Sequence, residues 1–514
     1  MLRSLLLTVA AATVTLSAAP EARAQAQGAD AQACGALAKV SEAGLRVTAA
    51  EIVPAQARWS PEPGAAPITV KAPFCRVQGV IETEIGFELW LPARAAWNGK
   101  FLGTGVGGDA GAFNFRDVPR GVARGYASGT TDSGHKQADR LWMLGDPMRL
   151  KNYELRAHHL LAVRSKDLIL AYYGSSPRHA YFIGCSGGGR QGLKEMQRFP
   201  ADYDGVIAGA GGPKTPEMTV RRMWELLLRD AHPGLMSPAD WKLIADAGVK
   251  TCDGLDGVAD GVAEDPRRCR FEVRSLGCKP GETAGCLSEE QVAFARQFYA
   301  PLQDRSGRAL DRGLLPGVLV DSGRSRLAPA TFAQAIRHVA EWDGKDFDAD
   351  RDLAAIDRVM PELRADDPDL SAFRAHGGKA IFYQGWMDPA VSANMIVDYQ
   401  KAIEARMGGE QATAEFERLF MVPGMLHCQG GAGPDQFGGS GGDAPIPDAQ
   451  HDLLSALEDW VERGRAPDRI VASKVVDGHV ARTRPLCAWP SEARYAGNGS
   501  TDDAANFACE RRPR

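Results

Sequence analysis

A serine between glycines carries the strongest chemical signal in the sequence. The run Gly184-Cys185-Ser186-Gly187-Gly188 has the G-x-S-x-G spacing and follows an apolar segment rich in β-formers. Glycines let the backbones of a tight strand-to-helix turn close, and the N-terminal amides of the following helix then point at the serine. The spacing predicts a nucleophile elbow with Ser186 as the nucleophile. A plain glycine-rich turn is the alternative.

Two residues far downstream could complete a nucleophilic site with Ser186. Asp388 lies in a turn after an apolar run that is typical of a buried strand, and His427 lies in a later loop. The order Ser, Asp, His along the chain is the order found in α/β-hydrolases. Taken singly, Asp388 could instead initiate a turn before the proline that follows it, and His427 could be an ordinary loop histidine.

A cysteine stands beside two of these three residues. Cys185 directly precedes Ser186, and Cys428 directly follows His427. If the two cysteines pair, their Cα atoms lie about 5.5 Å apart, which brings the serine and the histidine within hydrogen-bond range. Because such a bridge closes a long loop, the chain-entropy description of disulfides predicts that it stabilises the folded state by at most about 5 kcal/mol.

These motifs resemble the CS-D-HC arrangement of the tannase and feruloyl esterase family. The resemblance spans roughly residues 34–510 and implies an α/β-hydrolase fold with a large inserted lid domain. It also implies a carboxylic ester hydrolase that uses Ser186, His427 and Asp388. Further stretches similar to the family are Phe87–Pro92, Trp97–Leu102, Gly105–Gly108, Gly125–Ala127 and Thr131–His135.

The chain divides into four predicted parts. Residues 1–24 have the charged start, apolar core and small-x-small end of a signal peptide. Residues 25–214 and 375–514 form the first and second parts of the hydrolase core. Residues 215–374 lack the alternation of apolar strands and helices, and we expect them to form the lid domain, which carries a calcium loop and one wall of the substrate pocket.

The oxyanion hole is expected at two glycine amides. One belongs to Gly187, the residue after the nucleophile. The second belongs to the glycine turn after the apolar run Phe101–Gly105, where we assign it to Gly108, with Gly107 as the close alternative. An ordinary strand-end turn would give the same glycine pattern.

An acidic, glycine-rich run at residues 252–262 is suited to a hard cation with oxygen ligands. It is similar to the calcium loop of the family, which implies side-chain ligands from three aspartates and carbonyl ligands from two valines. The role of the Ca²⁺ would be structural. A set of Asp-Gly turns without metal is the alternative. The implied ligands are Asp253, Asp256, Asp260, Val258 and Val262.

All ten cysteines follow the predicted signal peptide, which indicates five disulfides in an exported protein, either secreted or periplasmic. Spacing alone does not give the connectivity. The family pattern implies the pairs Cys34–Cys75, Cys185–Cys428, Cys252–Cys269, Cys278–Cys286 and Cys487–Cys509.

Three weaker motifs surround these sites. Asp132, Ser133 and His135 contain the residue types of a triad but are too close in sequence to reach one another across a site. The glycine-rich run Gly430–Gly442 is predicted to be a loop near the active site. Asp448 is predicted to cap a helix with an apolar face at 453–461.

Composition excludes several functional classes. The chain is 44% hydrophobic and 24% charged, as in soluble globular proteins, and its formal charge of −5 gives no basis for nucleic-acid binding. No internal apolar run is long enough to span a membrane. The oligomeric state is not predicted.

We therefore expect a serine esterase that cleaves small esters of aromatic acids, of feruloyl (hydroxycinnamoyl) or galloyl type, through an acyl-enzyme. Alternative substrates are terephthalate half-esters and hydroxyacid oligomers. The alternative from another class is a non-catalytic, calcium-dependent binding protein on a hydrolase scaffold.

Overall fold

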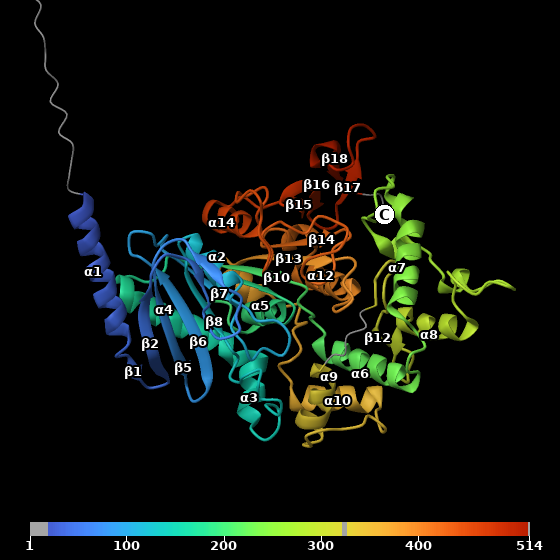
Figure 1. Ribbon diagram of the computed structural model, residues 1–514, viewed down its shortest axis with the longest axis horizontal. Coiled ribbons are helices and arrows are strands. Elements are labelled where there is room, and N and C mark those ends of the chain that lie inside the picture. Colours follow the sequence, from blue (N-terminus) through green and yellow to red (C-terminus); the bar gives the residue numbers. More distant parts are fainter. Residues whose placement is uncertain (1–18, 321–325, 512–514) are drawn as a thin grey trace, which may run out of the picture.

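The protein is built on one mixed sheet of ten strands, shown in the computed structural model of Figure 1. The structure describes residues 19–320 and 326–511, so most of the predicted signal peptide lies outside the described residues. Counted across the sheet, the five strands from β1 to β8 pair antiparallel, and the strands from β8 to β14 at the other edge pair parallel. In spatial order the strands are β1 (Ser41–Glu42), β2 (Leu45–Val53), β5 (Phe74–Ile81), β6 (Ile85–Pro92), β8 (Ala127–Thr131), β7 (Lys100–Thr104), β9 (His179–Cys185), β10 (Gly205–Gly209), β13 (Lys379–Gly385) and β14 (Glu417–Val422).

The central strands are buried on both faces, which explains their continuous apolar sequences. In β9, Phe182 packs into the cluster on one face, whereas Tyr181 and Ile183 pack into the cluster on the other. Side chains alternate across a strand, so an uninterrupted apolar run needs a cover on each side. The apolar run predicted to be a buried strand before Asp388 forms β13.

Helices provide that cover. The face that contains Phe182 is covered mainly by four long helices, and the face that contains Tyr181 and Ile183 is covered by α14 and a hairpin of two late strands. On the first face lie α1 (Ala19–Leu37), α4 (Ala157–Tyr173), α5 (Gly187–Arg198) and α12 (Ala393–Met407). On the second lie α14 (Leu453–Arg463), β15 (Arg469–Val476) and β16 (His479–Cys487). The smaller elements are α2 (Asp117–Ala123), α3 (Pro147–Lys151), α13 (Glu410–Thr413) and the strand pairs β3 (Gln56–Trp59) with β4 (Ile68–Val70) and β17 (Glu492–Tyr495) with β18 (Phe507–Glu510).

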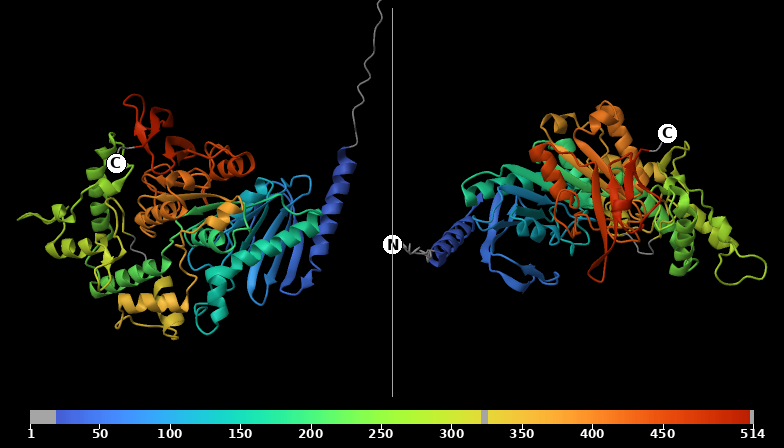
Figure 2. Two further views of the ribbon diagram at one scale, coloured as in Figure 1. Left: turned by 180° about the vertical axis from the view of Figure 1, so that it is seen from behind. Right: turned by 90° about the horizontal axis from the view of Figure 1, so that it is seen from above.

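A long, mainly helical segment is inserted between β10 and β13, where the sequence predicts one. It has one apolar cluster of its own and shares a second with buried residues between 106 and 153 of the core. Figures 1 and 2 show it, in green to yellow, at the opposite end of the molecule from β1. We call residues 215–374 the inserted segment. Its elements are α6 (Thr215–Ala231), α7 (Pro238–Cys252), α8 (Glu289–Tyr299), β11 (Leu302–Gln303), β12 (Ala309–Asp311), α9 (Leu327–Ala330) and α10 (Ala349–Val359), with α11 (Ser371–Ala375) at its end.

Five disulfides join the pairs that the family pattern implies. Their Cα–Cα distances run from 4.9 to 6.0 Å. This number of bridges indicates a protein that folds in an oxidising, extracellular environment. None of the helices in the described part of the chain has the length and apolarity to cross a bilayer.

The prediction for Asp448 is wrong. Helix α14 begins at Leu453, and its N-cap is Asp452, whose carboxylate accepts from the Ser455 amide at 2.8 Å. Asp448 instead accepts from the amides of Gln450 and His451 in the preceding turn. Two aspartates four residues apart both suit a cap, and only the tertiary position of the helix selects between them.

Candidate active site

Ser186 occupies a strained turn between β9 and α5. Its φ and ψ are +61° and −123°, a conformation that non-glycine residues rarely adopt. The flanking glycines permit this turn, because a Cβ on Gly188 would lie 2.9 Å from the backbone of Gly105 and one on Gly184 would meet the Gly188 carbonyl. The geometry is that of the predicted nucleophile elbow.

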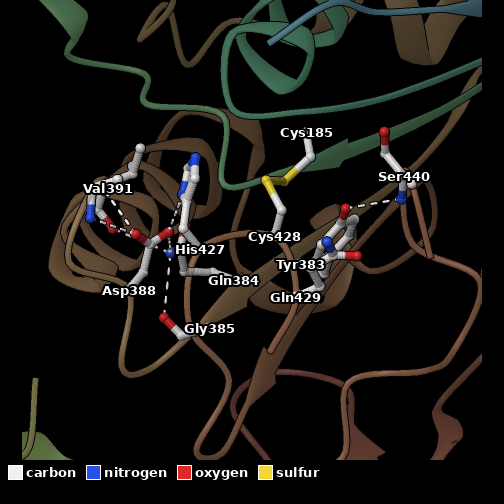
Figure 3. The surroundings of a disulfide bond; sticks show 12 residues. Cys185, Tyr383, Gln384, Gly385, Asp388, Val391, His427, Cys428, Gln429 and Ser440 are labelled. Atoms are coloured by element: carbon white, nitrogen blue, oxygen red, sulfur yellow. Dashed lines mark hydrogen bonds and ion pairs between the residues drawn. A yellow bond between two sulfur atoms is a disulfide. The ribbon is translucent and has the colours of Figure 1, made fainter. Parts of the chain in front are cut away.

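Asp388 holds His427 by a direct hydrogen bond, seen in Figure 3. Asp388 Oδ2 lies 2.8 Å from His427 Nδ1 and 2.9 Å from the Gln384 amide nitrogen. Its other oxygen, Oδ1, accepts from the backbone amides of Ala390 and Val391 at 2.7 and 2.9 Å. The Asp388 side chain is fully buried, so these four donors fix its orientation.

The Cys185–Cys428 disulfide joins the elbow to the histidine loop (Figure 3). Its Cα atoms are 6.0 Å apart, and the residues on either side of it, Ser186 and His427, line the same cavity. This cavity has a volume of about 470 Å³. The bridge therefore brings the predicted nucleophile and the predicted base, from loops far apart in sequence, to one hollow.

The two predicted oxyanion donors lie next to each other. A Cβ on Gly187 would be 3.1 Å from the Gly108 amide nitrogen and 2.8 Å from its carbonyl oxygen. Gly107 and Gly108 both line the cavity that contains Ser186. Gly187 is the first residue of α5, so its amide is free of the helix's own hydrogen bonds. The two predicted donors are therefore close neighbours, and their role in an oxyanion hole stays a prediction.

Helix α5 also fixes the glycine loop at residues 105–108, through a contact that the sequence did not predict. The buried Gln191 side chain accepts from the Val106 amide at 2.9 Å and donates to the Val106 carbonyl at 3.1 Å. The Tyr153 hydroxyl donates to the Gly108 carbonyl at 3.3 Å. Burial raises the pKa of Tyr153, so this hydroxyl keeps its proton. A polar residue facing inward one turn after the nucleophile was the available signal.

Core loops form the walls of the cavity. Phe113, Phe115 and Arg116 come from the loop before α2, and Ser440 and Gly441 come from the glycine-rich loop predicted to lie near the site. None of the described residues in the inserted segment lines it, although the sequence predicted a wall from that segment. The inserted segment instead contacts the loops that carry Asp388 and His427.

Two such contacts come from arginines. Arg222 of α6 donates to the carbonyl of Pro389, next to Asp388. The Arg267 guanidinium lies between the rings of Trp386 and Trp489, at 4.9 and 5.0 Å from their centroids. The inserted segment therefore supports the loop that carries the acid.

The predicted calcium loop folds around its own carboxylates. Asp253 accepts from the amides of Asp260 and Gly261, and Asp256 accepts from those of Val258 and Glu264, all at 2.9–3.1 Å. These carboxylates and the nearby carbonyls match a hard cation by their chemistry.

A positively charged side chain already pairs with one of the predicted calcium ligands. The buried Arg484 pairs with Asp260 and with Glu264. Within residues 19–320 and 326–511, no group of three or more His, Cys, Asp or Glu side chains is gathered closely enough to hold a metal by itself. An ion at this loop would need the backbone carbonyls as ligands and would compete with Arg484 for Asp260.

The motif of Asp132, Ser133 and His135 lies outside the cavity. Asp132 accepts from the amides of Gly86 and Gly134 and pairs with Lys136. His135 stacks on Trp142 with ring centroids 3.8 Å apart, and burial lowers its pKa to about 4. A neutral, stacked histidine in this position has a packing role.

The fold and the site together define an α/β-hydrolase with the residues of a serine esterase. Residues 69–318 and 328–510 match the family described as tannase and feruloyl esterase, and the chain belongs to this family. The protein is a carboxylic ester hydrolase. This excludes the alternative of a non-catalytic binding protein on a hydrolase scaffold.

Several relatives cover nearly the whole chain. An uncharacterised esterase from Xanthomonas campestris is 35% identical, over 91% of this chain and 89% of its own. The mono(2-hydroxyethyl) terephthalate hydrolase of Piscinibacter sakaiensis is 32% identical, over 90% and 89%. Among solved structures, feruloyl esterase B from Aspergillus oryzae is similar, with a TM-score of 0.88 and 28% identity over 94% of this chain and 100% of that one.

Proposed function

We propose that this esterase hydrolyses esters of aromatic carboxylic acids, of feruloyl or galloyl type, through an acyl-enzyme on Ser186. The arrangement that supports this most directly is the buried Asp388–His427 hydrogen bond beside the disulfide that joins the serine and histidine loops. Phe113 and Phe115 line the same cavity and offer aromatic faces to an acyl group.

In the first half-reaction, Ser186 Oγ attacks the ester carbonyl carbon while His427 Nε2 takes the hydroxyl proton. The amides of Gly187 and Gly108 donate to the oxyanion. The bond to the alcohol oxygen then breaks, and His427 gives its proton to that oxygen. Asp388 keeps Nδ1 of the histidine protonated, which leaves Nε2 as the base.

In the second half-reaction, a water molecule takes the place of the alcohol. His427 accepts a proton from this water while the water oxygen attacks the acyl carbon. The bond between the acyl carbon and Ser186 Oγ breaks, the serine regains the proton, and the carboxylic acid leaves. No external co-reactant is needed.

A panel of esters tests the substrate class. We expect kcat/KM values for methyl ferulate, methyl caffeate and methyl gallate to exceed those for butyl acetate by at least about tenfold, because the aromatic acyl group is desolvated against the phenylalanines. Mono(2-hydroxyethyl) terephthalate and an aliphatic hydroxyacid dimer represent the two alternatives. A higher kcat/KM for the aliphatic dimer than for every aromatic ester would contradict the proposal.

We also propose that the loop at residues 252–262 binds a structural Ca²⁺. The proposed ligands are the carboxylates of Asp253, Asp256 and Asp260 and the carbonyls of Val258 and Val262. Support comes from the donor chemistry and from the place of the loop in the fold. A Cβ on Gly424, in the loop that leads to His427, would overlap the Val262 side chain, so the two loops pack directly.

Chelation should lower the thermal stability of the protein. At free calcium one hundred times its Kd, binding stabilises the folded state by about 2.7 kcal/mol, and EDTA should remove this contribution. Scanning calorimetry with and without calcium measures the shift in Tm, and elemental analysis measures the bound metal. Asp253→Asn should abolish the shift, whereas Asp246→Asn, at an exposed site on α7, should preserve it. Equal Tm values with calcium and with EDTA would contradict the site.

For localisation, we propose export to the periplasm or the medium. The five disulfides support an oxidising compartment, and the sequence of residues 1–24 supports a cleaved signal. The predicted cleavage position falls within the first turns of α1.

A further inference from the structure

One cation at the rim of the active-site cavity has no anionic partner in the described part of the chain. Arg116 lines the cavity beside Ser186 and His427, and its side chain is exposed. Its Nη2 donates to the side-chain oxygen of Gln429 at 3.0 Å and to the carbonyl of Gly441. Both acceptors are neutral, so the charge of Arg116 is not compensated by them.

The guanidinium is held in place but keeps donors for a ligand. An arginine side chain has five N–H donors, and the two contacts of Nη2 use two of them. Nε and Nη1 make no side-chain hydrogen bond with the described residues. A Cβ on Gly441 would lie 3.0 Å from Arg116 Cζ, so the glycine gives the guanidinium room to lie against the loop.

The nearest acid on the cavity wall is already engaged. Asp117 is buried, and its Oδ1 accepts from Arg120 at 2.7 Å and from the Gly441 amide at 2.8 Å. Its Oδ2 accepts from the Ser440 hydroxyl at 2.6 Å. Asp117 therefore organises the loop instead of neutralising Arg116. Among the described residues that line the cavity, Arg116 is the one arginine or lysine.

We propose that Arg116 binds a carboxylate of the substrate, so that the preferred substrates are esters that carry a free carboxylate besides the ester bond. This inference rests on the proposed function and narrows its substrate class. A planar guanidinium with adjacent free N–H groups matches a carboxylate in a two-bond geometry. The carboxylate can belong to the acid part, as in half-esters of aromatic dicarboxylic acids, or to the alcohol part, as in aromatic esters of hydroxyacids.

Two matched pairs of esters test the proposal and separate these sources. The first pair is monomethyl and dimethyl terephthalate, with the charge on the acid part. The second is caffeoylquinate and methyl caffeate, with the charge on the alcohol part. For each pair, the measured quantity is the ratio of kcat/KM for the anionic ester to that for the neutral ester.

We expect Arg116→Met to lower this ratio about tenfold in at least one pair, mainly through a higher KM for the anionic ester. A tenfold change corresponds to the loss of one charge-assisted hydrogen bond. Arg116→Lys should restore part of the ratio, because it keeps the charge but not the planar donors. Higher ionic strength should lower the wild-type ratio and leave that of Arg116→Met unchanged.

Arg140→Met is the control for net charge, because Arg140 is exposed and is not part of the cavity wall. It should leave both ratios at the wild-type value. Unchanged ratios in Arg116→Met, with active wild-type enzyme, would overturn the role of Arg116 and leave the proposed function standing. A wild-type protein that hydrolyses none of the four esters would overturn both.

Discussion

Ser186→Ala should lower kcat for ester hydrolysis by about 10⁴- to 10⁶-fold, the range seen when a serine nucleophile is removed. The substitution removes the attacking oxygen and nothing else of the turn. Alanine keeps a Cβ, so the strained backbone of the elbow at φ +61° is occupied at the same cost. Any remaining rate would come from the oxyanion donors and substrate binding.

The measurement is kcat on the best ester of the panel, combined with Tm as a test of folding. Ser440→Ala is the matched control, because it removes another hydroxyl from the wall of the same cavity. Its hydroxyl donates to Asp117, and we expect activity within about tenfold of the wild type. A fluorophosphonate should add its mass to Ser186 in the wild type and not in Ser186→Ala. Turnover by Ser186→Ala at the wild-type rate would rule out the acyl-enzyme.

Asp388→Asn should lower kcat about 10⁴-fold with little change in fold, because it forces the wrong tautomer of His427. The amides of Ala390 and Val391 both donate to Oδ1, so the new amide group must keep its oxygen there. Its nitrogen then occupies the position of Oδ2, opposite His427 Nδ1. The histidine has to accept this bond at Nδ1, which places its proton on Nε2 and removes the base.

Two measurements separate this cause from simple loss of structure. The ¹H–¹⁵N spectrum of His427 should show protonated Nδ1 in the wild type and protonated Nε2 in Asp388→Asn at neutral pH. Gln384→Leu removes the other side-chain donor to Oδ2 and should cost far less, since the tautomer is unaffected. An Asp388→Asn variant with wild-type kcat would show that this carboxylate does not orient the base.

Local spacing predicted the tight turn at Ser186 and the proximity of the Ser186 and His427 loops. The elbow follows from steric exclusion within a few residues, since Gly184 and Gly188 pack against backbone wherever the rest of the chain lies. The same holds for the strand before Ser186, whose uninterrupted apolar sequence requires burial on two faces. The cysteines next to Ser186 and His427 linked two loops that no periodicity connects.

Calcium binding remains a prediction from the sequence pattern. The Asp253 and Asp256 carboxylates are oriented by backbone amides, as a metal loop requires, but Arg484 contacts Asp260 from a strand more than two hundred residues away. The spacing of residues in the loop identifies possible ligands, but it gives no information about a competing cation from another part of the chain. The calorimetric experiment decides whether the loop binds Ca²⁺ or whether Arg484 takes the place of the ion.

The sequence by itself determined the fold class and the ester hydrolase class, and it predicted a Ser, Asp, His set, because these depend on local sterics and on residue types at short spacing. Only the tertiary structure decided which residues surround the substrate and which hold the site in place. Arg116 reaches the cavity beside Gln429 and Gly441, and Gln191 meets Val106, through contacts between segments distant in sequence. Such contacts leave no periodic pattern, so the proposal that Arg116 binds a carboxylate could be made only from the folded structure.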